Sequence, residues 1–426
     1  MDLEYGLNDI PPRKVLLAMS LQWFAIIAPI LIIGSRIVAD IQYGDSLEKT
    51  TYIQKVFFIS GITLLAQLFW GHRLPIVVGP ASVLIVGIYA SLDSGFSSIY
   101  TSIAIGGLTL FILAITGSLD SLRKFFTEKV VSVILILVAI TLSPVIMGML
   151  ISESSIAAYN LIFSILFVTL LFFLSQRVKG FWNTTIIIWG LIFGSILYTA
   201  IFPQRFEIVT SGFGSVFYQF NLELSFRIDV IVPFLVCFFA LAINDLSSIY
   251  SVTEMMKMED SESRAKRGVS ITGLSNILSG IFGVIGSVNY SMSPGIISTT
   301  KCASRYAVIP AGIMLVSISF TPIFISLIGA IPRVIVGSIF LYIMCSQLAA
   351  GLSMIRIKDV NSGLSVGFPL LLSIVVTFLP EAVLCNFPSI LRPIIGNGFV
   401  LGVLITILME HVILREKGSR NQFWRK

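Results

Sequence analysis

Long runs of apolar residues, separated by short polar segments, follow one another along the whole chain. The first half holds seven runs, at about 14–37, 53–71, 76–92, 99–117, 130–150, 156–176 and 182–202. The second half holds seven more, at about 228–252, 268–286, 288–299, 307–329, 331–355, 364–384 and 388–412. Because a helix that crosses a bilayer needs about 20 consecutive apolar residues, these runs predict an all-α polytopic membrane protein with fourteen membrane segments.

The third run of each half is interrupted by a proline beside a glycine. The first segment, RLPIVVGPASVLIVGI (Arg73–Ile88), contains Gly79 and Pro80, and the second, GSVNYSMSPGIISTT (Gly286–Thr300), contains Pro294 and Gly295. Proline lacks a backbone N–H and tends to start or end a helix. Each segment therefore predicts a short strand followed by a half-length helix. The simpler alternative is that each proline only kinks an ordinary helix.

The two interruptions occupy matching places in the two halves. Pro80 and Pro294 lie 214 residues apart in a chain of 426. Seven segments per half is an odd number, so the second half must enter the membrane upside down. This predicts a 7+7 inverted repeat, with the first repeat at 1–203 and the second at 228–412. An extracellular linker (204–227) would separate them, and a cytoplasmic tail (413–426) would follow.

An inverted pair of broken segments would bring two half-helices together near the middle of the membrane. Their N-termini would point at one place and offer free N–H donors with partial positive charge, a site for carbonyl oxygens or anions. Broken backbone is tolerated at membrane depth only where protein or a water-filled cavity surrounds it. A matched pair therefore predicts the substrate site of a transporter.

The composition and the distribution of charge agree with a membrane protein. The chain is 56% hydrophobic and 12% charged, with a mean hydropathy of +0.96, which excludes an ordinary soluble domain. Fourteen segments place 21 of the 28 Lys and Arg residues on the side of the N-terminus and seven on the other. The positive-inside rule then predicts a cell-membrane protein with both termini cytoplasmic. The net charge of +6 reflects this topology, so no nucleic-acid partner is expected.

Asp245 is the only charged side chain between Asp229 and Glu254, in the middle of the eighth run. A carboxyl group inside a membrane helix is costly, and such groups usually mark an ion or substrate pathway. We expect Asp245 to carry a coupling proton. The alternative is a structural carboxylate paired with a backbone donor or a hydroxyl group. Asn244, Ser248 and Ser251 form a polar stripe beside it that is also compatible with simple interhelical hydrogen bonding.

Nothing in the sequence indicates catalysis or a bound metal. His72 and His411 fall at loop positions, and no nucleophile motif accompanies them. The four cysteines lack metal or disulfide spacing. We therefore expect no enzyme activity, no cofactor and no metal site.

Four stretches of the chain resemble the nucleobase–ascorbate transporter family, the uracil and xanthine permeases (nucleobase:cation symporters). They are PPRKVLLAMSLQWFAIIAPILI (Pro11–Ile32), GHRLPIVVGPASVLI (Gly71–Ile85), RGVSITGLSNILSGIFGVIGSVNYSMSPGIISTTKCASR (Arg267–Arg305) and IPRVIVGSIFLYIMCSQLAAGL (Ile331–Leu352). The resemblance implies an inverted repeat divided into a core and a gate domain. It further implies a small-molecule substrate between the third, eighth and tenth segments, a proton or Na⁺ moving alongside, and a homodimer formed through the gate domain.

The resemblance also implies which residues form the site, and several family ligands are replaced here. The family's conserved acid matches Asp245, whereas its substrate-binding Glu matches Leu241 and its Gln/Glu-Asn pair matches Met292 and Ser293. The aromatic residue of the third segment, the His of the first and an Asp of the ninth match Ser82, Trp23 and Thr272. The expected substrate-binding residues are Ser82, Ala81, Leu241, Asp245, Ser291, Met292, Ser293 and Trp23.

Three functions are compatible with these observations. The first is proton- or Na⁺-coupled symport of a nucleobase or a similar small heterocycle, with Asp245 as the coupling residue. The second is transport of an anion such as sulfate or bicarbonate on the same architecture, which the loss of a carboxyl group at Leu241 would favour. The third is a non-transporting membrane scaffold or sensor that kept the fold and lost the site.

Overall fold

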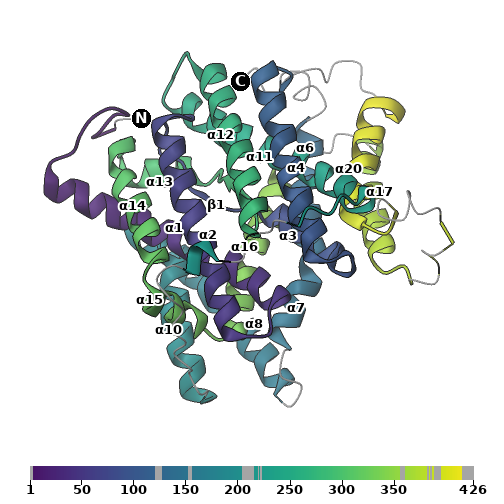
Figure 1. The fold of residues 1–426 in the computed structure, drawn as a ribbon, viewed down its shortest axis with the longest axis horizontal. Helices are drawn as coiled ribbons and strands as arrows, with labels where there is room; N and C mark the ends of the chain where they lie inside the picture. The colour runs from purple at the N-terminus through teal and green to yellow at the C-terminus, as the bar shows by residue number, and fades with distance from the viewer. Residues whose placement is uncertain are drawn as a thin grey trace.

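The fold is that of a computed structural model of the chain, shown in Figure 1. The structure describes residues 3–119, 127–151, 156–203, 215–218, 220, 223–355, 360–380, 383, 386–387 and 395–414. Most of the predicted linker at 204–227 and of the predicted tail at 413–426 lies outside these residues, as does the beginning of the apolar run predicted at 388–412.

The described chain is mostly helical, as the apolar runs predict. The helices of the first half are α1 (Arg13–Gln42), α2 (Ser46–Phe69), α3 (Ser82–Ala90), α4 (Phe96–Thr116), α6 (Glu128–Thr141), α7 (Ser143–Leu150), α8 (Ala157–Arg177), α9 (Phe181–Thr184) and α10 (Ile186–Ile201). Those of the second half are α11 (Ile228–Met255), α12 (Ser261–Phe282), α13 (Ser293–Thr300), α14 (Ile309–Ser319), α15 (Pro322–Gly329), α16 (Arg333–Met354), α17 (Val360–Thr377) and α20 (Gly398–Leu408). A π-helical turn, Met409–Ile413, continues α20.

Two three-residue strands are the other regular elements that position the site. They are β1 (Val78–Pro80), which precedes α3, and β2 (Ser287–Asn289), which precedes α13. Single turns of 3-10 helix occur at Leu92–Ser94, Ser215–Phe217 and Arg305–Ala307. The strands lie near the centre of the molecule in Figure 1, beneath α11 and α12.

Eight helices in the described part of the chain are long and apolar enough to cross a membrane, or nine if the bent pair α14–α15 counts as one span. The chain is therefore a multi-pass membrane protein. The run predicted at 307–329 is divided because the chain turns by 86° between α14 and α15, where Pro322 begins the second helix. The run predicted at 130–150 forms α6 and α7, which meet at Leu142 and together count as one of the eight spans. The count of fourteen segments remains a prediction.

Close packing of α4 against α12 fixes the scaffold beside the strands. Gly107 on α4 and Gly273 on α12 face each other, and a Cβ atom added to Gly273 would lie 2.8 Å from the Gly107 carbonyl oxygen and 2.7 Å from the Phe111 backbone nitrogen. Small residues allow helix backbones in a membrane to approach in this way, and the association relies on packing. α12 in turn carries Thr272 and Asn276, and Asn276 Nδ2 donates to the Ser287 carbonyl oxygen of β2 at 3.0 Å.

We predict that Gly273→Val destabilises the protein by about 1–3 kcal/mol, because the added side chain would clash with the backbone of α4. The apparent unfolding temperature of purified protein in detergent measures this. Gly148→Ala on α7 is the control, since no atom lies within 4 Å of a Cβ at that position. Equal stability of the two variants would contradict the packing described here.

Candidate functional site

The two broken segments meet by pairing their strands. β1 and β2 are antiparallel, with Val78 opposite Asn289, Gly79 opposite Val288 and Pro80 opposite Ser287. Both segments consist of a strand followed by a short helix, as the sequence predicts, and neither is a kinked continuous helix. The pairing joins parts of the chain more than 200 residues apart and gives the buried strand backbone hydrogen-bond partners.

Further bonds extend the pairing at its ends. The Tyr290 N–H donates to the Val77 carbonyl oxygen at 2.8 Å, and the Ala81 N–H donates to the Gly286 carbonyl oxygen at 2.9 Å. The Tyr290 hydroxyl donates to the Pro80 carbonyl oxygen at 2.5 Å. The start of α3 is thereby attached to the loop before β2, so the two half-helix ends hold a fixed relation to each other.

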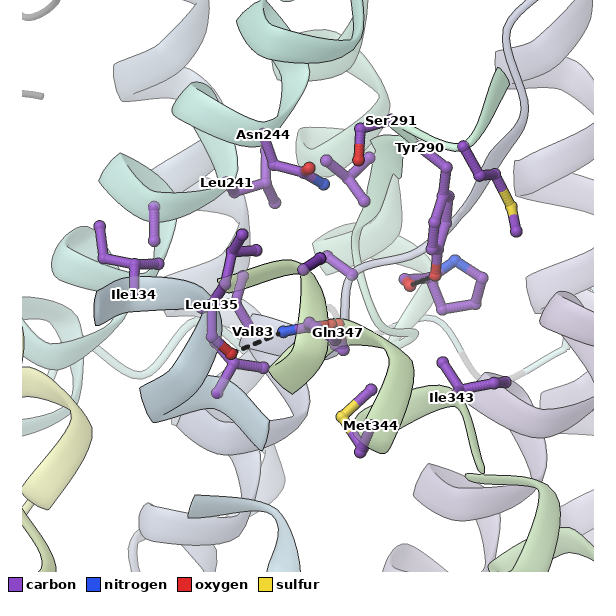
Figure 2. A pocket seen from close by; sticks show the side chains of 18 of the residues that line it. Val83, Ile134, Leu135, Leu241, Asn244, Tyr290, Ser291, Ile343, Met344 and Gln347 are labelled. Carbon is purple, nitrogen blue, oxygen red and sulfur yellow. Dashed lines mark hydrogen bonds between the residues drawn. The ribbon is translucent and has the colours of Figure 1, made fainter. Parts of the chain in front are cut away.

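A cavity of about 510 Å³ lies beside this junction. It is lined by α1, by the starts of α3 and α13, and by α6, α11 and α16 (Figure 2). The lining residues are Ile30, Ile33, Gly34, Pro80, Ala81, Ser82, Val83, Ile85, Val131, Ile134, Leu135, Val138, Ile187, Ala240, Leu241, Ile243, Asn244, Ser247, Ser251, Val288, Tyr290, Ser291, Met292, Phe340, Ile343, Met344, Gln347, Ala350 and Met354.

The two sides of the cavity differ in chemistry. One side, here called the polar wall, consists of Ser82, Asn244, Ser247, Ser251 and Ser291. The opposite side, here called the apolar wall, comes from α6 and α16 and consists of Val131, Ile134, Leu135, Val138, Phe340, Ile343 and Met344. Figure 2 shows Asn244 and Ser291 on one side of the cavity and Ile343 and Met344 on the other.

Asp245 lies behind the strand and does not line the cavity. Its side chain is fully buried. One carboxylate oxygen, Oδ1, accepts from the Asn289 N–H at 2.8 Å, and Oδ2 accepts from the Thr272 hydroxyl at 2.7 Å. Asp245 thus connects α11 to β2 and to α12. The sequence predicts a buried acid facing the interior of the bundle, and the structure places the carboxylate on the backbone of the second broken segment.

The carboxylate belongs to a larger buried network. The Thr272 hydroxyl oxygen accepts from Gln67 Nε2 at 3.0 Å and from Asn289 Nδ2 at 3.4 Å. His72 Nδ1 accepts from the Leu74 N–H at 2.9 Å, which leaves Nε2 to donate to Asn289 Oδ1 at 3.2 Å. The sequence analysis placed His72 at a loop position, and nothing in the sequence indicates that His72 and Gln67 belong to one hydrogen-bond network.

Arg264 connects this network to the N-terminal end of α12. Arg264 Nη1 donates to the His72 carbonyl oxygen at 2.8 Å, and Nε donates to Asp260 Oδ1 at 2.8 Å. The hydrogen bond and the charge of Arg264 hold the pKa of Asp260, in the polar turn between α11 and α12, below its ordinary value. The bond to His72 secures the chain just before β1.

The expected substrate-binding residues divide into two groups. Ala81, Ser82, Leu241, Ser291 and Met292 line the cavity, and so does Pro80 of the first interruption. Gly79, Pro294 and Gly295 shape the backbone but do not line it.

Ser293 and Trp23 also lie outside the lining, together with Asp245. The Ser293 hydroxyl accepts from the Val77 N–H at 3.0 Å and donates to the Tyr290 carbonyl oxygen at 2.8 Å, so it supports the junction from behind. Trp23 is buried on α1, and its Nε1 has no hydrogen-bond partner among the described residues. The α1 residues in the lining are Ile30, Ile33 and Gly34, two to three turns further along the helix.

The first turn of α13 offers fewer donors than the sequence suggests. The Ser293 N–H donates to the Tyr290 carbonyl oxygen at 3.4 Å, and Pro294 has no N–H. The N–H groups of Gly295 and Ile296 both donate to the Met292 carbonyl oxygen, at 3.1 and 3.4 Å. The three N–H groups of this turn are therefore not free to bind an anion.

Some lining residues gave no distinct signal in the sequence. Gln347 of α16 is one of them: its Nε2 donates to the Leu135 carbonyl oxygen at 3.2 Å, and the residue also lines the cavity. The apolar wall consists of residues that are ordinary in any membrane helix. Within the described residues, no three His, Cys, Asp or Glu side chains are grouped so that they could hold a metal ion.

Known proteins share this sequence pattern and this fold. Residues 14–382 match the model of a family described as Permease family. The nucleobase transporter PlUacP of Paenibacillus larvae is 26% identical over 404 residues, which cover 91% of this chain and 90% of that protein. The uric acid permease PucJ of Bacillus subtilis is 22% identical over 404 residues, which cover 88% and 89%.

A solved structure shows the same architecture. The transmembrane domain of a cyanobacterium bicarbonate transporter, BicA, superposes with a TM-score of 0.65 at 15% identity, covering 94% of this chain and 98% of that one. At this level of identity the likeness shows a common fold.

We predict that Asp245→Ala lowers stability by about 1–3 kcal/mol, because it leaves the buried Asn289 N–H without an acceptor. Asp245→Asn should cost less, since the amide oxygen can still accept from that N–H. Unfolding of the purified variants in detergent measures the difference. An Asp245→Ala protein as stable as the unaltered chain would show that the carboxylate does not hold the strand.

Proposed function

This chain belongs to the xanthine and uracil permease family, and we propose that it carries a nucleobase across the cell membrane by secondary-active symport. The observation that supports this most strongly is the cavity at the junction of two broken segments, with a buried carboxylate directly behind one of them. Broken segments in corresponding positions of two halves are typical of transporter substrate sites. The relatives named above are a nucleobase transporter and a uric acid permease.

In this proposal the substrate lies between a core domain and a gate domain. The core contains α1–α4 and α11–α15, which supply the strands and the polar wall. The gate contains α6–α10, α16, α17 and α20, and its helices α6 and α16 supply the apolar wall. Relative movement of the two domains would expose the cavity first to one side of the membrane and then to the other. Ser82, Asn244 and Ser291 would contact the substrate directly.

Protonation of Asp245 would act on the strand through Thr272. As a carboxylate, Asp245 accepts from the Asn289 N–H and the Thr272 hydroxyl. A proton on Oδ2 turns an acceptor into a donor that faces this hydroxyl. The Thr272 oxygen already accepts from Gln67 and Asn289 and has only two lone pairs. One of these amides must then release it, so the proton changes the contacts of β2. We propose H⁺ as the coupling ion, with Na⁺ as the alternative.

The orientation and the assembly are part of the same proposal. The distribution of Lys and Arg residues supports cytoplasmic N- and C-termini. The exposed faces of α8 and α10 carry large apolar side chains, among them Leu166, Phe173, Phe193 and Ile196. These faces belong to the proposed gate domain and would contact lipid or a second copy of the chain in a homodimer.

We predict that proteoliposomes containing the protein take up protons when a transported base is added, and that Asp245→Asn abolishes this proton uptake while retaining base exchange. Uracil, xanthine and hypoxanthine are the first bases to test, with internal pH followed by a trapped dye. Proton coupling that persists in Asp245→Asn would remove Asp245 from the coupling role. Stable protein that takes up no base in any condition would favour the scaffold or sensor alternative.

Asn244→Ala should raise the KM for the transported base about tenfold, since one hydrogen bond to a buried polar group is removed. Ser270→Ala on α12 is the control, because the Ser270 hydroxyl donates to the Lys266 carbonyl oxygen at an exposed position outside the cavity. An unchanged KM in Asn244→Ala would show that the polar wall does not contact the substrate.

A further inference from the structure

We propose that the cavity selects an uncharged heterocycle with one hydrogen-bonding edge and one alkylated edge, of which an N-methylated oxopurine is the simplest representative. This inference rests on the proposed function and names the substrate class of the same site. Three properties of the cavity support it: the lack of charge in its lining, the division into two walls, and its size.

The lining offers no charged side chain to an ion. No Asp, Glu, Lys, Arg or His is among the described residues that line the cavity. The Tyr290 hydroxyl is engaged by the Pro80 carbonyl oxygen, and Asp245 is turned toward Asn289 and Thr272. The N–H groups in the first turn of α13 are bonded to backbone carbonyls. A charged substrate would lose its hydration and meet no side chain of opposite charge, which disfavours anionic bases such as urate and small anions such as bicarbonate.

The polar wall supplies hydrogen bonds to one edge of a flat molecule. Asn244, Ser247 and Ser251 lie on successive turns of α11, and Ser82 and Ser291 lie at the starts of the two half-helix segments. The four serine hydroxyls have no hydrogen-bond partner among the described residues. Asn244 Nδ2 donates to the Asn289 carbonyl oxygen at 3.4 Å, which leaves Oδ1 as a free acceptor. Such a row pairs with the carbonyl and N–H groups along one ring edge.

The apolar wall offers almost no hydrogen-bonding groups to the opposite edge of the substrate ring. Val131 and Ile134 of α6 and Phe340 and Met344 of α16 contribute only carbon and sulfur atoms. Gln347 uses its Nε2 on the Leu135 carbonyl oxygen and presents at most its amide oxygen. A ring N–H that faces this wall loses its hydrogen bond to water, whereas a methyl group in the same place gains from leaving water.

Apolar side chains border the polar wall. Leu241 lies near Asn244 on α11 (Figure 2). Met292, which also lines the cavity, follows Ser291 in the sequence. A base with donors and acceptors around its whole perimeter, such as unsubstituted xanthine, would leave several of them unpaired here. The cost of unpaired buried groups is what discriminates between such ligands.

The size of the cavity leaves room for the substituents. Pockets of about 300–1,000 Å³ bind drug-sized ligands, and this cavity of about 510 Å³ lies within that range. A purine ring therefore fits together with alkyl groups directed at the apolar wall.

The test compares binding of methylated and unmethylated bases to the full-length protein purified in detergent. Theophylline, caffeine, xanthine, urate and bicarbonate are the probes, and stabilisation against heat gives the relative affinities because each ligand binds only the native state. We expect theophylline or caffeine to bind at least tenfold more tightly than xanthine, and urate and bicarbonate to give no shift. Xanthine or urate binding as tightly as the methylated compounds would overturn the inference while leaving nucleobase transport intact. No binding by any base would overturn both.

A second test uses substitutions of Leu241 to shift the selectivity from theophylline toward xanthine. Leu241→Glu places a carboxylate beside Asn244 and should raise the affinity for xanthine relative to theophylline by about tenfold. Leu241→Gln adds hydrogen-bonding capacity without charge and covers the case in which the Glu variant does not fold. Gly148→Ala serves as the control outside the cavity. If a folded variant at position 241 binds xanthine and theophylline with the same relative affinities as the unaltered protein, this part of the wall does not contact the substrate.

Discussion

The need to pair backbone groups inside a membrane governs the centre of this molecule. Two segments are extended at Val78–Pro80 and Ser287–Asn289 before their half-helices begin, and lipid offers no hydrogen-bond partners to the N–H and C=O groups of extended backbone. β1 and β2 solve this by pairing with each other, and Asp245 accepts the N–H of Asn289. The site forms because the strands of the two broken segments pair with each other, so both halves of the chain are needed to build it.

The cavity derives its chemistry from this junction and from what faces it. The half-helix starts and α11 contribute hydroxyl and amide groups, and α6 and α16 contribute hydrocarbon. Because the carboxylate is used by the strand and not by the cavity, ligand recognition and ion coupling are separated in space but joined through Asn289 and Thr272. A shared fold with a bicarbonate transporter domain is thus compatible with a site that binds an uncharged ligand, since function resides in the side chains.

The sequence predicts much of this arrangement and misses the rest for identifiable reasons. Gly79–Pro80 and Pro294–Gly295 predict both breaks, because proline and glycine act on the backbone of their own segment. Asp245 is conspicuous as the only charged residue between Asp229 and Glu254, in the middle of α11. Its partners, Thr272 and Asn289, depend on how three distant segments pack, and local sequence does not contain that. Trp23, expected in the site by resemblance, lies outside the lining. The apolar wall is invisible to sequence because its residues are typical of any membrane helix.

The paired strands beside a two-sided cavity are the feature on which substrate binding depends. The most direct measurement is a cryo-electron microscopy structure of the protein with a transported base bound. It should show β1 and β2 paired in the register Gly79 opposite Val288, with the base between them and α16, its polar edge at Asn244 and Ser247. A continuous helix through Pro80 or Pro294, or a base bound away from this cavity, would contradict the account.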